Sequence, residues 1–254
     1  MIERAKTGRI LPLVATGLVM GLTAVTAAQG PASETFAESQ LYVELNDTDG
    51  DLGLHGLIDG EPWTMLTITG PDRRHVLQVA AFGSMRRQGL TEIFFESAEP
   101  DFDELAPEEF FSRFREGTYR ITGRLQEGGR IASTAVLSHV LAAPPENIFV
   151  NGLPAAESCD AEELPTVTAP VTIDWDPVTT SHPELGKSGA VTISRYQFFV
   201  EREGVKLSVD LPPTLTSFQI PASITSLGDE FKFEIIARTS TGNNTAVESC
   251  FRVS

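Results

Sequence analysis

Apolar and polar positions alternate along much of the chain. Leu41, Val43 and Leu45 are separated by one residue each, and this period of two is the pattern of a strand that is buried on one face. The same alternation recurs in two further segments: Tyr119 and Ile121, then Ala135, Leu137 and Leu141. Turn signals fall at short spacing: Asp59-Gly60, Gly70-Pro71, Gly83-Ser84, Gly128-Gly129 and Thr241-Gly242-Asn243. Short strands with this punctuation predict an all-β fold, built as a sandwich or a barrel.

One segment departs from this pattern and predicts a helix over about 107–116. Pro107 stands in its first turn, Glu108 and Glu109 follow, and Gly117 can end it. This order suits the helix dipole and the usual caps. The apolar edge of the segment consists of Phe110, Phe111 and Phe114. We interpret it as a short crossover packed against a sheet.

Paired prolines mark a boundary near the middle of the chain. Ala143-Pro144-Pro145 ends the preceding strand and stiffens the connection, because proline cannot donate to a sheet. The sequence therefore predicts two tandem β-sandwich domains, over 36–142 and 148–254, after an N-terminal signal segment at 1–28. A chain of 254 residues is long enough for two domains with separate cores.

The segment after Pro165 contains a series of family-like strands. In Pro170–Val178, apolar residues at every second position lead to Trp175 and the nearby Pro177. Tyr196 lies in the next alternating strand, and Leu227 and Phe231 lie in a later one. Further segments of the series are Leu211-Pro212, Thr214, Phe218–Pro221 and Thr241–Thr245. Together these residues resemble a fibronectin type III domain. The resemblance implies a sandwich that serves as a spacer, an adhesion module or a docking surface, without catalysis.

Phe231 departs from the family pattern. The family usually has a tyrosine there, whose hydroxyl bonds back to the backbone; Phe231 keeps the packing and loses that bond. The first domain resembles the immunoglobulin-like sandwiches of exported bacterial proteins, through Gly117–Ile121 and the Gly128-Gly129 turn. This second resemblance implies a fold only, because such sandwiches serve many functions.

The start of the chain has the layout of a signal peptide. Arg4, Lys6 and Arg9 precede an uncharged stretch over Ile10–Ala28, which ends in small residues. We therefore expect cleavage at the end of this stretch and an exported protein, located in a periplasm, on a cell surface or outside the cell. The alternative is an uncleaved anchor, and then this segment is the membrane contact.

Two cysteines, Cys159 and Cys250, remain in the exported chain. In an oxidising compartment, such a pair predicts one disulfide. The alternative is two buried thiols, which the polar surroundings of Cys159 disfavour.

Charge and composition exclude several classes of function. Asp and Glu number 35 against 19 Lys and Arg, which gives a formal net charge of −16. Such a chain repels phosphate backbones, and no basic stripe interleaved with aromatic residues is present, so we expect no nucleic-acid partner. Apolar residues make up 41% of the chain and Phe alone accounts for 15 positions, which excludes a wholly disordered chain.

An acidic turn is the candidate metal site. Its ligands would be Asn46, Asp47, Asp49 and Asp51, placed around a glycine. Oxygen atoms at alternate positions of such a turn can wrap Ca²⁺, which is the one cofactor we consider. The spacing departs from a helix-loop-helix calcium loop, because Leu52 stands where that loop requires glycine. The alternative is an ordinary polar turn between strands.

A second acidic segment supplies the catalytic alternative. Between Glu96 and Glu109 the charged residues are all acids: Glu96, Glu99, Asp101, Asp103, Glu104, Glu108 and Glu109. Paired carboxylates can act as acid and base on a sugar, so the first domain could be a glycan-processing or other hydrolase with an accessory second domain. The non-catalytic interpretation of this segment is a solvated loop that leads into a helix. Nucleophile-elbow and zinc-helix motifs are absent from the sequence.

Taken together, the signal, the strands and the missing catalytic sets predict an exported, non-catalytic binding or spacer protein. Its partner would be a protein or a glycan. A calcium-stabilised adhesion module is the remaining alternative.

Overall fold

The structure is a computed structural model that describes residues 34–254. The predicted signal segment at 1–28 lies outside the described residues and stays a prediction. Within the described part, no helix combines the length and the apolar run that a bilayer crossing requires.

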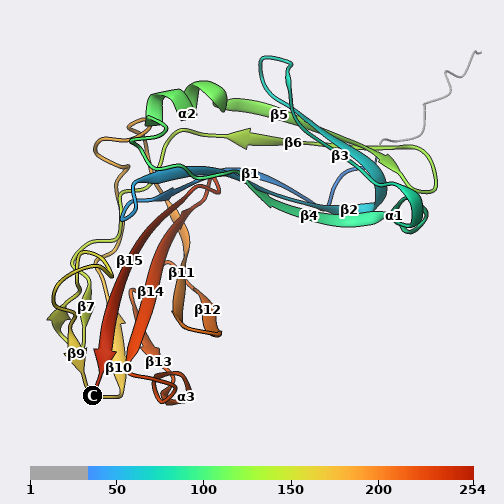
Figure 1. Cartoon of the computed structure of the whole chain (residues 1–254). Coiled ribbons are helices and arrows are strands. Elements are labelled where there is room, and N and C mark those ends of the chain that lie inside the picture. The colour runs from blue at the N-terminus through green and yellow to red at the C-terminus, as the bar shows by residue number, and fades with distance from the viewer. Residues whose placement is uncertain (1–33) are drawn as a thin grey trace, which may run out of the picture. The chain divides into compact units, whose positions relative to one another are not determined.

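The N-terminal sandwich contains six strands and two short helices (Figure 1). In chain order these are β1 Glu38–Asn46, β2 Asp51–Thr69, β3 His75–Ala80, α1 Gly83–Gln88, β4 Leu90–Glu96, α2 Pro107–Arg113, β5 Gly117–Leu125 and β6 Arg130–Leu137. The long β2 organises them. Its first half pairs with β1 and β4, and its second half pairs with β3 and β5.

The core of this sandwich follows the predicted alternation. Leu41, Val43 and Leu45 are all buried, and so are Tyr119 and Ile121. They belong to one hydrophobic cluster that extends from Phe36 to Leu141 and includes Trp63, the largest fully buried side chain among residues 34–254. The period of two therefore identified the inward-facing side of these strands correctly.

The C-terminal sandwich consists of two facing sheets. Its elements are β7 Phe149–Val150, β8 Leu153–Pro154, β9 Thr166–Val167, β10 Val171–Asp174, β11 Ile193–Arg202, β12 Val205–Leu211, β13 Ser217–Ile220, α3 Ala222–Thr225, β14 Glu230–Thr239 and β15 Asn244–Val253. One sheet has the order β13-β10-β7-β8, and the other contains β12-β11-β14-β15. A second hydrophobic cluster fills the space between them.

Of the residues that resemble the fibronectin type III pattern, some are buried in this second core and others are exposed. Trp175 is 3% exposed and packs edge-on against Tyr196 at 5.4 Å between ring centroids. The Tyr196 hydroxyl accepts a hydrogen bond from the backbone N–H of Val178 at 2.8 Å. Phe231 is buried and stacks on Phe251. The remaining two signature residues, Pro177 and Leu227, are exposed.

The fold class agrees with the sequence prediction: the chain is all-β, with two sandwiches in tandem. The predicted helix corresponds to α2, which begins at Pro107 and ends at Arg113, and Phe110 is its buried residue. Two short helices were not expected. α1 occupies the Gly83-Ser84 turn signal, and α3 follows Pro221.

The two sandwiches share one sheet. β1 pairs in parallel with the start of β15, through Glu44 with Asn244, Leu45 with Thr245 and Asn46 with Ala246. An eleven-stranded sheet therefore includes strands of both sandwiches. Its main path is β12-β11-β14-β15-β1-β2-β5-β6, and β3, β4 and β9 pair beside this path. Figure 1 shows β15 meeting β1. The described residues belong to one compact unit, so the division into domains at 36–142 and 148–254 stays a prediction.

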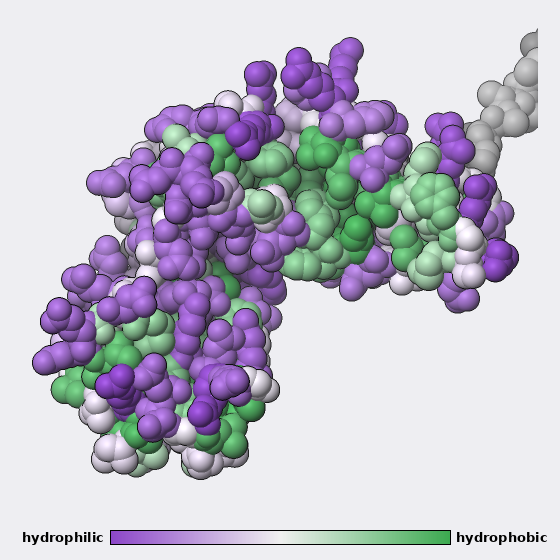
Figure 2. Space-filling model, in the orientation of Figure 1, coloured by the Kyte–Doolittle hydropathy of each residue, from purple (hydrophilic) through white to green (hydrophobic). Residues whose placement is uncertain are grey.

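The visible surface is mostly hydrophilic. Figure 2 shows hydrophobic residues gathered over the part formed by β1–β6, among polar neighbours. Large apolar side chains that are exposed in this sandwich include Phe82, Met85, Phe94 and Val136.

Candidate functional site

The predicted calcium turn is held together by its own side chains. The Asn46 Oδ1 atom accepts hydrogen bonds from the backbone N–H groups of Thr48 and Asp49, and Asn46 Nδ2 donates to Asp49 Oδ2 at 3.0 Å. Such bonds from an asparagine to the backbone two and three residues ahead are usual in polar turns. Two of the four predicted ligands thus contact each other directly.

Asp47 points to a different partner, in the loop after β10. His182 is 7% exposed, and its Nδ1 accepts backbone hydrogen bonds from Glu184 and Leu185. A neutral imidazole has one donor and one acceptor nitrogen, so the proton is on Nε2. That atom donates to Asp47 Oδ1 at 3.0 Å. Asp47 therefore ties the C-terminal sandwich to the β1–β2 turn.

Asp51 lies beside the second acidic segment. Burial raises the pKa of Asp51 to about 6, and the charges of Glu99 and Asp49 add to the effect. The four predicted calcium ligands thus have different partners: Asn46 and Asp49 bond to each other, Asp47 bonds to His182, and Asp51 lies near Glu99. The calcium site stays a prediction.

The second acidic segment contributes to an ion pair around His55. His55 is 3% exposed in β2, and its Nε2 lies 2.7 Å from Glu99 Oε1. A Cβ atom on Gly53 would lie 1.8 Å from the same oxygen, so glycine there makes room for the carboxylate. Burial alone would lower the pKa of His55, but the Glu99 hydrogen bond and the charges of Glu44, Glu99 and Glu96 raise it.

Glu96 completes a group that could hold a metal. It stands directly opposite His55 in the β2–β4 pair, and the ligand atoms of His55, Glu96 and Glu99 lie within 4.8 Å of one another. An imidazole and carboxylates form a donor set that suits Zn²⁺. The direct hydrogen bond between His55 and Glu99 also accounts for their approach without an ion.

The junction between the sandwiches is polar, and one buried asparagine forms several of its hydrogen bonds. Asn243 is 1% exposed; its Oδ1 accepts from the Val43 N–H at 2.9 Å. Its Nδ2 donates to the carbonyls of Ser138 at 2.9 Å and Val140 at 3.0 Å. Next to it, the Thr245 hydroxyl donates to the Ala142 carbonyl at 2.9 Å. These bonds connect β1, the segment after β6 and the start of β15.

A loop of the C-terminal sandwich adds further contacts to the N-terminal one. Leu185 packs on the N-terminal hydrophobic cluster. Lys187 forms an ion pair with Glu116, and its backbone N–H donates to the His139 carbonyl at 2.8 Å. With the Asp47–His182 bond, these contacts make the junction an extended interface rather than a single hinge.

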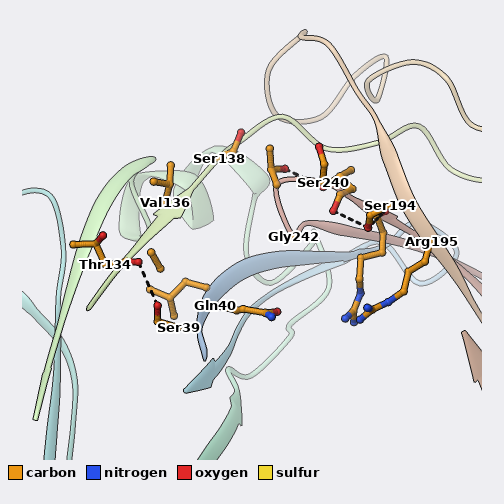
Figure 3. A pocket seen from close by; sticks show the side chains of 14 residues that line it. Ser39, Gln40, Thr134, Val136, Ser138, Ser194, Arg195, Ser240 and Gly242 are labelled. Carbon is orange, nitrogen blue, oxygen red and sulfur yellow. Dashed lines mark hydrogen bonds between the residues drawn. The ribbon is translucent and has the colours of Figure 1, made fainter. Parts of the chain in front are cut away.

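An open pocket of about 520 Å³ lies at this junction (Figure 3). Its walls come from both sandwiches: β1, β6 and the following residues on one side, and β11 and the β14–β15 turn on the other. The pocket residues are Ser39, Gln40, Leu41, Thr134, Ala135, Val136, Ser138, Ser194, Arg195, Arg238, Thr239, Ser240, Thr241 and Gly242. Half of them carry hydroxyl groups, and the charged ones are both arginines.

A β-bulge brings the two arginines together. The β11–β14 register shifts between Ile193 and Arg195, so that Arg195 stands directly opposite Arg238. The bulged Ser194 is held by its hydroxyl, which donates to the carbonyls of Arg238 at 3.0 Å and Thr239 at 3.2 Å. Bulges commonly re-aim a side chain in this way. In Figure 3, the Arg195 side chain extends into the same region as that of Gln40.

The predicted disulfide is present: Cys159 and Cys250 are joined. The bridge connects the segment between β8 and β9 to the last strand, β15. It lies apart from the junction pocket, among whose lining residues neither cysteine appears.

Sequence reasoning did not find the junction residues. Asn243 belongs to a turn signal in the sequence, and no local pattern distinguishes Arg195 and Arg238 from other arginines. Their separation along the chain hides their proximity, which depends on strand register. The sequence signal at this place is the Thr241-Gly242-Asn243 turn, which the polar residues Asn244 and Thr245 follow.

Comparisons with known proteins give a likeness at low identity. No protein-family model matches the chain, and no curated protein matches it either. A solved two-domain fibronectin type III segment of chicken tenascin is 13% identical, covers 84% of this chain and 98% of its own, and gives a TM-score of 0.29. A bacterial ice-binding adhesin is 12% identical over 87% of this chain and 66% of its own (TM-score 0.25), and the human OSCAR ligand-binding domain is 11% identical over 87% and 98% (TM-score 0.27). At these identities and TM-scores the likeness assigns the chain to no family and carries no argument about its function.

Proposed function

We propose that the protein is an exported, non-catalytic module that both spaces and binds, and that its binding site is the junction pocket. The observation that carries this proposal is the pocket itself, which is built by residues of two sandwiches that share a sheet. A site at an interface between domains is a frequent place for a ligand. The two sandwiches would be domains over 36–142 and 148–254.

Export is supported by the Cys159–Cys250 bridge, because structural disulfides persist mainly in oxidising compartments. The acidic surface, with a net charge of −16 over the whole chain, suits a module that stays soluble outside the cell. The partner would be a protein or a glycan.

The binding part of the proposal is tested by blocking the pocket. Ser240 is exposed in the pocket wall, so Ser240→Trp fills the pocket and leaves both arginines in place. The matched control is Ser223→Trp, at an exposed position of α3. We expect the full-length wild type and the control to bind the same members of a glycan and peptide array, and Ser240→Trp to lose them. Binding that survives in Ser240→Trp would move the site elsewhere, and an array without any binding would leave only the spacer role.

The spacer part is tested at Asn243. Asn243→Ala removes three hydrogen bonds, one from the buried Val43 N–H and two to the part-buried carbonyls of Ser138 and Val140. Because an unsatisfied buried polar group costs on the order of 1–3 kcal/mol, we expect the free energy of unfolding to fall by about 2–4 kcal/mol in urea denaturation. Gln197→Ala, which removes an exposed bond to Ser208 in the same sandwich, is the control and should change stability little. A variant as stable as the wild type would mean that the junction is not held by this network.

A further inference from the structure

The arginine pair in the junction pocket is electrostatically unusual. Arg195 and Arg238 are directly opposite residues of an antiparallel pair, so their side chains lie on the same face of the sheet. Like charges in this position repel each other and destabilise the pair. Acidic residues outnumber basic ones almost two to one in this chain, so two facing arginines are unexpected from composition alone. We therefore look for groups that offset the repulsion between them.

The described residues offset the repulsion only in part. Arg195 Nε lies 3.5 Å from Asp210 Oδ2, which is ion-pair distance without hydrogen-bond geometry. Arg238 lies over the ring of Tyr42, 5.4 Å from its centroid. Burial raises the pKa of the Tyr42 hydroxyl, and the positive charge of Arg238 opposes this rise. Within the described part of the chain, the Nε atoms of both arginines are buried and have no hydrogen-bond partner. The Arg195 side chain as a whole is 41% exposed, and both arginines line the pocket, so the pair is accessible to a ligand from that side.

Asp210 pairs with Arg195 and the Tyr42 ring lies under Arg238, and an oxyanion bound in the pocket would further offset the repulsion between the two arginines. Two guanidinium groups side by side present flat arrays of N–H donors that match the oxygens of an oxyanion such as a carboxylate or a phosphate. The rest of the wall matches a different chemistry. Hydroxyl groups line it, from Ser39, Thr134, Ser138, Ser194, Ser240 and Thr241, and Gln40 adds an amide.

These hydroxyl and amide groups suit a ligand that carries hydroxyls next to its charged group. The pocket volume of about 520 Å³ falls within the usual range for small-molecule sites. A hydroxylated carboxylate therefore matches the two arginines, the hydroxyl groups and the size of the pocket together.

We propose that the junction pocket binds an acidic sugar unit, whose carboxylate pairs with Arg195 and Arg238 and whose hydroxyls bond to the surrounding serine and threonine residues. This inference rests on the proposed function, because it names the ligand class of that same pocket. The acidic sugar is either free or part of a polysaccharide, since both present the same carboxylate and hydroxyls.

Titration calorimetry on the full-length protein tests the ligand class. The probes are galacturonate, polygalacturonate, galactose and inorganic phosphate. We expect galacturonate to bind, galactose to bind at least tenfold more weakly, and phosphate to bind more weakly than galacturonate. Tighter binding of polygalacturonate than of galacturonate would identify the polymer as the source. Higher salt should weaken binding, because the contact is between charges.

Variants assign the binding to the arginines. Arg195→Gln and Arg238→Gln should each weaken galacturonate binding at least tenfold, and the double variant should abolish it. Arg252→Gln is the matched control, since Arg252 is an exposed arginine of β15 that pairs with Glu230, and it should bind as the wild type does. Equal binding by all variants would overturn the proposal, and so would phosphate binding as tight as that of galacturonate.

The outcomes separate this inference from the function on which it rests. If Ser240→Trp loses array partners while no acidic sugar binds the wild type, the pocket is the binding site and the ligand class is wrong. If acidic sugars bind equally to wild type and Ser240→Trp, the pocket is not the site, and both proposals fail.

Discussion

Glu234 offers a sharp test of the electrostatics of the shared sheet. It lies in β14 directly opposite Glu248 of β15, so two carboxylates face each other on the same surface. Burial raises the pKa of Glu234 to about 7, and the charges of Glu248 and Glu44 add to this, against the opposing charges of Lys206 and Lys232. Glu248 also forms an ion pair with Lys232, whose Nζ lies 2.5 Å from Glu248 Oε2.

The perturbation is Glu234→Gln, which keeps the shape and removes the charge. The pKa of Glu234 in the folded state lies above the ordinary value of 4.5, so the folded protein holds this proton more tightly than the unfolded chain does. The associated stability is present below the unfolded pKa and is lost as the pH rises through about 7. One pKa unit corresponds to about 1.4 kcal/mol, and partial solvent screening reduces the total, so we expect a cost of about 1–3 kcal/mol above pH 8.

Urea denaturation between pH 4.5 and pH 8.5 measures this cost. We expect Glu234→Gln to match the wild type at the acidic end and to exceed its free energy of unfolding by about 1–3 kcal/mol at the alkaline end. Asp51 and His55 also have raised pKa values, so a weaker slope of the same sign should persist in the variant. Glu203→Gln, in the exposed turn after β11, is the control. A difference between variant and wild type that does not grow with pH would refute this reasoning.

Three further outcomes are expected. Replacing Cys159 and Cys250 together with serine should lower the free energy of unfolding by up to about 4.5 kcal/mol, because the bridge closes a loop of 91 positions; an unchanged urea melt would contradict this. If Asn46, Asp47, Asp49 and Asp51 hold calcium, Ca²⁺ at 100 times its Kd should stabilise the protein by about 2.7 kcal/mol, and an unchanged melting temperature rules the site out. The full chain should turn over no member of a glycan and ester panel, and an activity that disappears in the Glu96→Gln, Glu99→Gln double variant would establish the hydrolase alternative instead.

Much of the fold could be predicted because a strand that is buried on one face has alternating apolar and polar residues within its own sequence. The alternation at Leu41, Val43 and Leu45 reports which side of β1 faces the core, and it needs no knowledge of the partner strands. The helix α2 was found for a similar reason, since proline, acids and a phenylalanine edge all lie within one short segment. The helix α1 has no comparable apolar pattern in its sequence, because none of its residues is buried.

The candidate site could not be predicted, because it depends on register and not on local pattern. Arg195 and Arg238 meet only because a bulge at Ser194 shifts one strand against the other. Asp47 and His182 are 135 positions apart, and neither residue's neighbours indicate the other. The acidic turn was conspicuous in the sequence, yet its side chains serve mainly to close the turn and to reach across the junction.

The parallel pairing of β1 with β15 has a consequence for the order in which the protein folds. Val43 and Asn243, which bond across the junction, are 200 positions apart, so β1 leaves the ribosome long before its partner exists. Until β15 arrives, the outer edge of β1 exposes unpaired backbone groups, and such edges invite pairing with other chains. The N-terminal sandwich therefore completes its sheet only when the last strand of the C-terminal sandwich has been made. An N-terminal sandwich made without the C-terminal one would keep an unpaired β1 edge that can pair with other chains. Contacts between residues so far apart in the chain also favour slow folding.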